Sequence, residues 1–522
     1  MRRTSSALLV ASLLTAGLSA QNLPEVRWQH AAEAAAPWVP QEVHWVGRDQ
    51  FVWSQVGGAN PARELLAVDG AVARFEVDIS GAAALSRSAA GARPDRLYAL
   101  DAGAPGGGST LNGAVRAYDP WSANGAQSMP AVWVHSLGTA FAGGAQLVCD
   151  PAGERVVVAI GTATGVQVDQ LAGQDGLLLS RCFLPGTSVQ SLAVSADGST
   201  VAVGAGAHVW VLDDQGVLRF GQALAASAAE LSLSADGGRL ALATLGGTQV
   251  LERVGTGYQL LQQIASQGVW PGASLSARLQ LSADGARLAV AHWYYTGNNV
   301  ASFEVWQLDG PQRLWHEGQW APAGSLQNLP VAARITGDGQ RAAFASWGNG
   351  VHDEVVWVDL GDNNRERRVD LAGSAMGLDL SDDGGQLAIA SKAVHAQVAS
   401  ALGSVQVLQM ADWNLRQQSA ARPGQALSVR AHNPGGYFAL FLVGPEAPAV
   451  TVGGVAGLLQ VNRAQLSVSA AALNAAGEAD WSVVLPAGLI GPELPFALQV
   501  AFRDGSGTWI APELLRPLVL AQ

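Results

Sequence analysis

The residues best able to bind a metal ion or carry acid–base chemistry are spread thinly along this chain of 522 residues. Its nine histidines form no His-x-x-x-His or His-x-His pair, and its two cysteines, Cys149 and Cys182, are widely separated. Metal sites built from one stretch of chain need such close spacings. The sequence therefore predicts no metal site and no cofactor. The alternative is that His292, His352 and His395 converge in space.

Motifs for a catalytic nucleophile or a phosphate loop are also missing. No Gly-x-Ser-x-Gly occurs, and the serines of a recurring Ser-Ala-Asp-Gly phrase belong to turns, where a hydroxyl can bond to nearby backbone. The glycine-rich run from Gly103 leads into no helix, whose N-terminus a phosphate loop requires. We therefore assign no catalytic residue.

An internal repeat is the strongest signal in the chain. Each copy is an apolar alternation, a turn centred on Asp-Gly and a second apolar alternation, which predicts a tight two-stranded hairpin. The clear copies start at Ser191, Glu230, Arg278, Ala333 and Leu378, and weaker ones at Gln146, Ala84 and His44. The turn glycines are Gly91, Gly153, Gly198, Gly237, Gly285, Gly339 and Gly384.

A third and a fourth strand follow each hairpin, as in Val209 to Asp213 and then Val217 to Leu224. A four-stranded sheet that is apolar on both faces must pack against further sheets, so the units are expected to stack in a ring. The prediction is an all-β fold: a β-propeller over residues 41–420, with eight blades. Seven blades is the alternative if residues 41–79, or a closing strand at 25–30, only complete a terminal blade.

The pattern Ser-x-Asp-Gly-x-x-Leu-Ala-Val, followed by a Val-Trp-x-x-Asp strand, resembles the WD-repeat and YVTN-like propellers of secreted bacterial proteins. The resemblance implies a fold and no particular activity. The Gly-His dipeptide of eukaryotic WD repeats is missing, and so is an Asp-x-Asp-x-Asp-Gly calcium loop.

After residue 420 the Asp-Gly hairpins stop, and short apolar strands alternate with Pro and Gly turns. Residues 422–522 are therefore predicted to form a second, β-sandwich-like domain. Residues 21–40 form an N-terminal segment. We carry no function over to the C-terminal domain.

Alignment of the first strands by their Asp-Gly turns places charged residues at equivalent positions. Glu230 of blade 5 matches Arg278 of blade 6, and Arg334 of blade 7 matches Asp379 of blade 8. Ion pairs between neighbouring blades are expected, because an unpaired buried charge is costly. The same alignment puts the two cysteines on the first and fourth strands of blade 3. Three strand spacings exceed disulfide reach, so two separate thiols are predicted.

Composition limits the partners and the location of the chain. The net charge is −12, and only Lys392 is a lysine among 30 basic residues, so no nucleic-acid surface is expected. Residues 1–20 read as a signal peptide cleaved after Ala20, with two arginines ahead of a short apolar run. We expect a secreted or periplasmic protein without a transmembrane segment in its mature form.

Loop lengths predict where a ligand binds. The loops between second and third strands are short in blades 3, 4 and 5, and longer in blades 6, 7, 8, 1 and 2, which are consecutive around a ring. We expect these long loops, with Trp270 and Trp320 of the inter-blade links, to form a raised crescent on one face. The predicted contact residues are Trp293, Tyr294, Tyr295, Asn299, Trp347, His352 and His395.

The function favoured by this pattern is a secreted, non-catalytic scaffold that binds a protein or glycan. Propellers present a broad and rigid loop surface, and the chain shows no catalytic motif. The alternatives are a propeller enzyme of the lactonase, hydrolase or quinoprotein-like type, with acids and histidines at the ring opening, or a glycan-binding protein that uses some of its 17 tryptophans. Trp210, Trp306 and Trp357 recur at one repeat position and are expected in the core.

Overall fold

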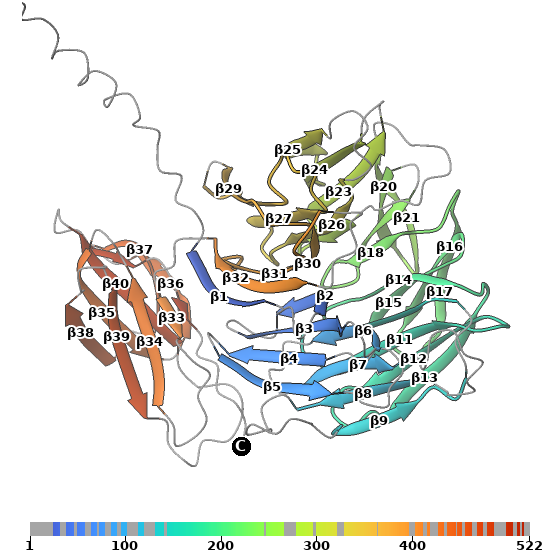
Figure 1. Cartoon of the computed structure of the whole chain (residues 1–522), viewed down its shortest axis with the longest axis horizontal. Coiled ribbons are helices and arrows are strands. Elements are labelled where there is room, and N and C mark those ends of the chain that lie inside the picture. Colours follow the sequence, from blue (N-terminus) through green and yellow to red (C-terminus); the bar gives the residue numbers. More distant parts are fainter. Residues whose placement is uncertain are drawn as a thin grey trace, which may run out of the picture.

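β-strands form the described part of the chain, and all of their pairings are antiparallel except that of β37 with β41 (Figure 1). The computed structural model describes residues 96–101, 113–119, 131–139, 143–244, 247–265, 278–295, 299–320, 328–362, 364–395 and 402–410, together with strand segments between residues 25 and 90 and between 415 and 515. The described residues contain strands and turns and no helix, which confirms the all-β prediction.

Eight four-stranded antiparallel sheets lie in this part of the chain, and we number them as blades from the N-terminus. Blade 1 holds β2 (Trp38–Trp45), β3 (Gln50–Gly57), β4 (Glu64–Asp69) and β5 (Val72–Asp78). Blade 2 holds β6 (Leu85–Ala90), β7 (Leu97–Asp101), β8 (Ala114–Tyr118) and β9 (Trp133–Ser136). Blade 3 holds β10 (Ala145–Cys149), β11 (Arg155–Gly161), β12 (Val166–Ala172) and β13 (Leu178–Leu184). Blade 4 holds β14 (Val189–Val194), β15 (Thr200–Ala205), β16 (His208–Asp213) and β17 (Leu218–Ala223).

The second half of the ring follows the same order. Blade 5 holds β18 (Glu230–Leu233), β19 (Arg239–Thr244), β20 (Gly247–Val254) and β21 (Gly257–Ala265). Blade 6 holds β22 (Arg278–Leu281), β23 (Arg287–Tyr295), β24 (Asn299–Gln307) and β25 (Gln312–Trp320). Blade 7 holds β26 (Pro330–Ile335), β27 (Arg341–Ser346), β28 (Val355–Asp359) and β29 (Arg365–Val369). Blade 8 holds β30 (Ala375–Leu380), β31 (Gln386–Lys392), β32 (Gly403–Gln409) and β1 (Glu25–Ala31).

The first strands of the eight sheets contact one another in cyclic order, so the sheets form a closed ring. The closing sheet combines both ends of the repeat region, because β1 pairs with β32 as its outermost strand. At the same seam the backbone nitrogen of Trp45 donates to Asp379 Oδ2 at 2.8 Å. The segment at residues 25–30 therefore closes blade 8, while blade 1 remains a complete sheet.

Two further sheets follow the ring. One consists of β33 (Leu415–Gln417), β34 (Ala426–His432) and β39 (Glu478–Val484). The other contains β35 (Gly436–Gly444), β36 (Glu446–Thr451), β37 (Val455–Val461), β38 (Ser467–Ala472), β40 (Ala497–Asp504), β41 (Trp509–Ala511) and β42 (Leu514–Leu515). None of these strands pairs with a strand of the eight blades within the described part of the chain.

The repeated turn is held by its own side chains. In blade 6 the Ser282 hydroxyl donates to Asp284 Oδ1 at 2.6 Å and accepts the backbone N–H of Arg287 at 2.9 Å. Ser195, Ser234, Thr336 and Ser381 make the same two bonds in blades 4, 5, 7 and 8. The following glycine, Gly285, has a φ of +68°, which favours glycine. The hydroxyls are therefore structural, as the sequence indicated.

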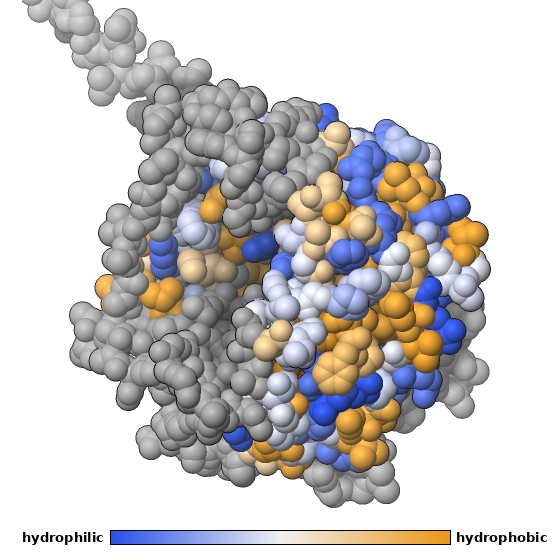
Figure 2. Space-filling view, turned by 90° about the vertical axis from the view of Figure 1, so that its right-hand side faces the viewer, coloured by the Kyte–Doolittle hydropathy of each residue, from blue (hydrophilic) through white to orange (hydrophobic). Residues whose placement is uncertain are grey.

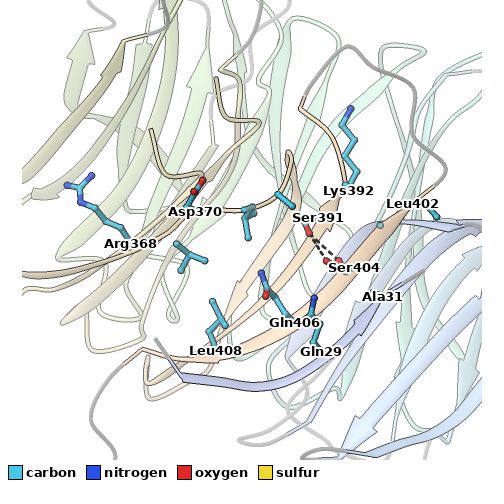
Figure 3. A pocket seen from close by; sticks show the side chains of 15 residues that line it. Gln29, Ala31, Arg368, Asp370, Ser391, Lys392, Leu402, Ser404, Gln406 and Leu408 are labelled. Atoms are coloured by element: carbon cyan, nitrogen blue, oxygen red, sulfur yellow. Dashed lines mark hydrogen bonds between the residues drawn. The ribbon is translucent and has the colours of Figure 1, made fainter. Parts of the chain in front are cut away.

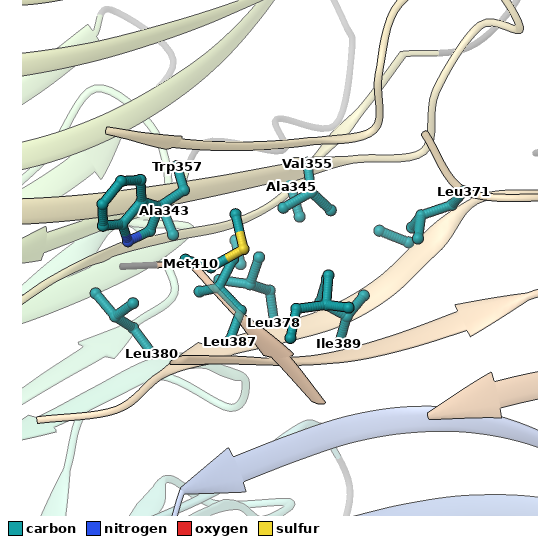
Figure 4. Close-up of a cluster of buried hydrophobic side chains, with 13 residues drawn as sticks. Ala343, Ala345, Val355, Trp357, Leu371, Leu378, Leu380, Leu387, Ile389 and Met410 are labelled. Carbon is teal, nitrogen blue, oxygen red and sulfur yellow. The ribbon is translucent and has the colours of Figure 1, made fainter. Parts of the chain in front are cut away.

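Apolar clusters between neighbouring blades form the core. Figure 4 shows the cluster between blades 7 and 8, where Trp357, Leu378 and Ile389 pack together. The Trp357 indole also donates to the Gly384 carbonyl in the turn of blade 8 at 2.9 Å. Trp210 and Trp306 are partly buried against the clusters with the preceding blades 3 and 5, whereas Trp357 faces the next blade. The three tryptophans therefore do not share one repeat position, as the strand pairing also shows. Each sheet thus buries both faces only because it has a neighbour on each side.

The outermost strands face solvent and carry large apolar side chains among charged ones. Phe183 of β13, Leu218 of β17 and Leu260 of β21 are exposed. Figure 2 shows this side wall as interspersed apolar and hydrophilic residues. Arg181 and Arg219 form ion pairs on the same strands. Charges on such edges oppose strand-to-strand association.

The cysteines occupy the predicted strands, Cys149 on β10 and Cys182 on β13, and both are thiols, which confirms the prediction. Burial raises the pKa of Cys149, and burial with the nearby Asp169 charge raises the pKa of Cys182 to about 11. Within the described residues no helix is long and apolar enough to cross a membrane.

We expect Ser282→Ala to lower the free energy of unfolding by about 1–3 kcal/mol, because it removes two hydrogen bonds from a buried turn. Urea unfolding followed by circular dichroism measures the change. Ser199→Ala is the matched control: Ser199 lies in the same turn of blade 4, with its hydroxyl 3.4 Å from Thr200 Oγ1. Equal losses for the two variants would contradict the role of the repeated hydroxyl.

Both thiols should react slowly with Ellman's reagent in the native protein at pH 8. A thiol with a pKa of about 11 is ionised to only about one part in a thousand at that pH, and the thiolate is the reactive form. Two thiols should react rapidly after unfolding in guanidinium chloride. Fewer than two after unfolding would mean that the cysteines are oxidised.

Candidate binding site at the top face

The channel through the ring opens differently at its two ends. We call the end that carries the links between blades the top face, because the first strand of each blade starts there and runs toward its Asp-Gly turn. A cavity of about 440 Å³, the mouth cavity, is lined at the top by strand-start residues such as Gln190, Ala229 and Pro330. A second cavity of about 520 Å³, the base cavity, is lined by turn residues such as Ala196 and Ala283.

Four charged residues separate these cavities, and we call them the charge belt: Glu230, Arg278, Arg334 and Asp379. Arg278 Nε lies 3.9 Å from Glu230 Oε2, and Arg334 Nε lies 3.3 Å from Asp379 Oδ1. Both predicted inter-blade ion pairs are therefore confirmed. Arg334 Nη1 also lies 3.9 Å from Glu230 Oε1, so the belt joins blades 5 to 8 across the channel.

The segment from His292 is not the long loop that we predicted. Strands β23 and β24 continue through it, with His292 opposite Ser302 and Tyr295 opposite Asn299, so it is an extended hairpin of blade 6. Side chains alternate along β23, so Tyr294 lies on the same face as Leu288 and Val290, which pack against blade 5. Tyr294 is buried. Tyr294 is therefore wrong as an exposed contact residue.

Trp293 points to the opposite side of β23, toward blade 7, and is half-buried. The side chains of Tyr295 and Asn299 lie outside what the structure describes, as does Trp270. Trp320 ends β25. The long loops of blades 1 and 2 are also outside the described residues.

The loop between β27 and β28 carries Trp347 and His352. The backbone nitrogen of Trp347 donates to the Leu329 carbonyl at 2.9 Å, and the Ser374 hydroxyl donates to the Trp347 carbonyl at 2.6 Å. The indole of Trp347 lines the mouth cavity. Asn349 Oδ1 accepts the backbone N–H of His352 at 3.0 Å, which fixes the turn. Backbone contacts with Leu329 and Ser374 thus hold Trp347 at the rim of the channel.

A buried carboxyl joins this loop to blade 8. The side chain of Glu354 is fully buried, its Oε2 accepts the Leu371 backbone N–H at 2.7 Å, and its Oε1 lies 3.6 Å from His395 Nδ1. Glu354 fills space beside Gly348, where a Cβ would come within 2.1 Å of Oε1. Burial, aided by the charges of Asp370 and Asp353, raises the pKa of Glu354 to about 7.

A groove of about 480 Å³ runs outward from this point between blades 7 and 8 (Figure 3). Its lining includes Asp370, Ser391, Lys392, Ser404 and Gln406, and the hydroxyls of Ser391 and Ser404 lie 2.9 Å apart. The Lys392 ammonium is 5.9 Å from the centroid of the Trp347 ring, within range of a cation–π contact. Lys392 and Trp347 therefore stand between the groove and the mouth cavity.

Of the predicted contact residues, the structure brings Trp347 and His395 to the boundary of blades 7 and 8, and it places His352 in the Trp347 loop with Asn349 as its partner. Sequence reasoning missed Glu354 and Lys392 as members of this site. Lys392 carried a signal, since it is the single lysine and ends an apolar strand. Glu354 also carried one, because it directly precedes the apolar strand β28.

Metal binding finds no support among the described residues, where no three His, Cys, Asp or Glu side chains gather as ligands. His292 is buried beside Glu304 within blade 6, and burial lowers its pKa. The alternative that joins His292 to His352 and His395 is therefore wrong for this structure. The remaining polar and aromatic groups are suited to binding a ligand. They are the Trp347 indole at the cavity rim, the guanidinium groups of Arg278 and Arg334 below it and the Lys392 ammonium beside it.

No family model and no curated protein matches this chain. Among solved structures, Sqt1 of Chaetomium thermophilum, bound to the N-terminus of the ribosomal protein L10, matches with a TM-score of 0.51 and 14% identity over 74% of this chain and 100% of that chain. The C-terminal WD40 domain of Sif2 matches with a TM-score of 0.49 and 11% identity over 75% and 99%. Together with the ring of four-stranded sheets, the likeness to Sqt1 shows a WD40-like β-propeller fold and nothing about activity.

The raised pKa of Glu354 makes stability depend on pH. A carboxyl with a pKa of about 7 when folded and about 4.5 when unfolded binds more protons in the native state, so stability should fall as pH rises from 4.5 to 7. In the wild type this carboxyl should lower the free energy of unfolding by about 2–4 kcal/mol over that range. Glu354→Gln should not show this decrease. Urea unfolding at pH 5, 6, 7 and 8 measures it. The control is Glu252→Gln, a half-exposed carboxyl on β20, which should keep the wild-type slope. A wild-type slope in Glu354→Gln would contradict the assignment.

Proposed function

We propose that this chain is an exported, non-catalytic scaffold that binds a protein segment at the top face of its propeller. The observation that carries the proposal is the position of Trp347, which lines the mouth cavity, contacts Lys392 and is fixed through its own backbone. Rigid aromatic side chains beside a cavity are typical anchors of protein recognition, because little conformational entropy is lost when they bind.

The structure of Sqt1 gives this proposal a precedent. That propeller is described as bound to the N-terminus of another protein, so a ring of similar fold can hold a chain terminus. Here Trp347 lines the mouth cavity and Lys392 lines the groove, and the Lys392 ammonium lies 5.9 Å from the centroid of the Trp347 ring. Two concave surfaces thus lie on either side of this contact.

Export and domain organisation are further parts of the proposal. The signal-like residues 1–20 support secretion or a periplasmic location, and they lie outside the described residues. The two sheets formed by β33–β42 support a separate β-sandwich-like domain, expected at 422–522, after the propeller expected at 41–420. In the structure β1 (Glu25–Ala31) also belongs to the propeller, and β33 (Leu415–Gln417) to the first of the two sheets. The repeat pattern resembles that of secreted bacterial propellers, and this supports a bacterial origin for the combination of propeller and C-terminal domain.

A propeller enzyme is the second candidate, and the Glu354–His395 pair favours it. A buried carboxyl next to a partly exposed imidazole can orient that imidazole as a general base. A screen of esters and lactones with the wild-type chain and His395→Ala tests this candidate. Turnover that disappears in His395→Ala would favour the enzyme over the scaffold.

We expect Trp347→Ala to weaken the binding of peptide ligands at least tenfold. The ligands are obtained by selecting a phage library of random 12-residue peptides on the full chain, and the synthetic peptides are then measured by fluorescence anisotropy. A buried indole anchor contributes enough energy for this loss. Trp347→Phe, which keeps an aromatic ring, should lose less.

Phe183→Ala is the matched control, because Phe183 is an exposed aromatic residue on the side wall. It should bind the peptides as the wild type does. Equal affinities of Trp347→Ala and wild type would refute the top-face site. If no peptide is selected and the chain binds a glycan array in a way that depends on Trp347, the ligand is a glycan and not a protein segment.

A further inference from the structure

The groove between blades 7 and 8 is lined by polar side chains that other protein groups do not satisfy. Gln29 of β1 and Gln406 of β32 are partners in the strand pairing, and both line the groove (Figure 3). Asp370, which follows β29, lines it from the side of blade 7. Among the described residues, these two amides and this carboxylate have no hydrogen-bond partner. The groove therefore offers open donors and acceptors.

Two hydroxyls extend this polar surface. Ser391 of β31 and Ser404 of β32 also line the groove, with their oxygens 2.9 Å apart. Each hydroxyl can donate one hydrogen bond and accept two, so the bond between them leaves capacity for a ligand. Neighbouring strands are about 4.8 Å apart, and alternate residues of one strand about 6.6 Å apart. The four side chains on blade 8 thus form a compact grid on one face of the sheet.

The third strands of other blades show that a polar residue at the position of Gln406 is ordinarily satisfied within its own sheet. Gln406 pairs with Ile389, five residues after the turn glycine, and Asp169 of blade 3 and Glu304 of blade 6 hold the equivalent register. Asp169 accepts from Arg181 at 2.7 Å, and Glu304 accepts from the Trp306 indole at 2.7 Å. Gln406 has no such neighbour among the described residues and stays open to the groove.

The charges of the lining favour a neutral ligand. Asp370 would repel an anion, and Lys392 would repel a cation. The other basic residue, Arg368, is engaged by Glu317 and Glu366 at 2.7 and 2.6 Å. Since both signs of charge are present, the uncharged amides and hydroxyls are the groups on which selection can depend.

The groove also has an apolar part. Leu371 and Leu408 line it and belong to the core cluster between blades 7 and 8. Its volume of about 480 Å³ lies within the usual range of small-ligand sites, about 300–1,000 Å³. A purely apolar ligand would cover the open polar groups without bonding to them, which costs free energy. The ligand must therefore combine apolar surface with several groups that both donate and accept.

We propose that the groove between blades 7 and 8 binds a neutral oligosaccharide, with its hydroxyls bonded to the amides of Gln29 and Gln406 and to the carboxylate of Asp370. A sugar hydroxyl both donates and accepts, and the C–H face of a pyranose ring can pack on Leu371 and Leu408. This site is separate from Trp347, which does not line the groove, so the inference goes beyond the proposed function.

The test applies the labelled full chain to an array of neutral and anionic oligosaccharides. Each neutral oligosaccharide that binds is then titrated in solution by isothermal calorimetry. We expect saturable binding of at least one neutral oligosaccharide. Binding of no array member, or of sulfated and sialylated members alone, would overturn the inference.

Two variants locate the bound sugar. Asp370→Ala should weaken its binding at least about tenfold, and Gln406→Ala about three- to tenfold, because hydrogen bonds to a charged group are stronger than those between neutral groups. Gln406→Ala should keep the wild-type urea midpoint, because the Gln406 amide bonds to no described residue.

Gln249→Ala is the matched control. Gln249 pairs with Leu242, which is also five residues after its turn glycine, so it holds the register of Gln406 in blade 5. This variant should bind the sugar as the wild type does. Equal affinities of wild type, Asp370→Ala and Gln406→Ala would overturn the groove as the site.

Trp347→Ala separates this inference from the proposed function. It should leave oligosaccharide binding unchanged while it weakens the selected peptides. Oligosaccharide binding that is lost in Trp347→Ala and kept in Gln406→Ala would overturn the groove site. Sugar binding that depends on Gln406, with peptides that ignore Trp347, would overturn the top-face scaffold and leave this inference standing.

Discussion

The innermost strand of every blade has an edge that no strand covers, and this constraint organises the channel. A backbone N–H at such an edge needs an acceptor. Side chains of the preceding blade provide it: Glu230 Oε2 accepts from Leu279 at 3.2 Å, Ser232 Oγ from Leu281 at 3.0 Å and Gln280 Oε1 from Ile335 at 3.0 Å. Polar residues must therefore alternate along the inner strands. The channel is lined by groups that hold the ring together.

The same constraint prepares the candidate site. Charged side chains that reach across to the next blade also meet one another at the channel axis, where they form the charge belt and divide the channel into two cavities. Because the belt is built from structural contacts, its geometry is fixed before any ligand arrives.

The loops above the belt are fixed by buried polar groups rather than by regular strands. Gln319 is fully buried and donates to the Asp353 carbonyl at 2.9 Å, while Glu354 accepts from Leu371. These bonds anchor the Trp347 loop to blades 6 and 8. The proximity of Glu354 and His395 links the two loops that carry the predicted contact residues.

The sequence by itself determined the repeating hairpin, the propeller and the equivalent positions of the four charge-belt residues on the first strands. A turn motif and the two-residue alternation of a strand are local properties, and the repeats show them many times. It also indicated Trp347 and His395 through loop position. Only the tertiary structure decided that the segment from His292 continues as strands, since apolar aromatic residues fit a loop or a buried hairpin equally well until the neighbouring blade is present. Only the tertiary structure, too, brought Glu354 to His395 and Lys392 to Trp347, because these contacts join loops of different blades whose separation the chain order does not encode.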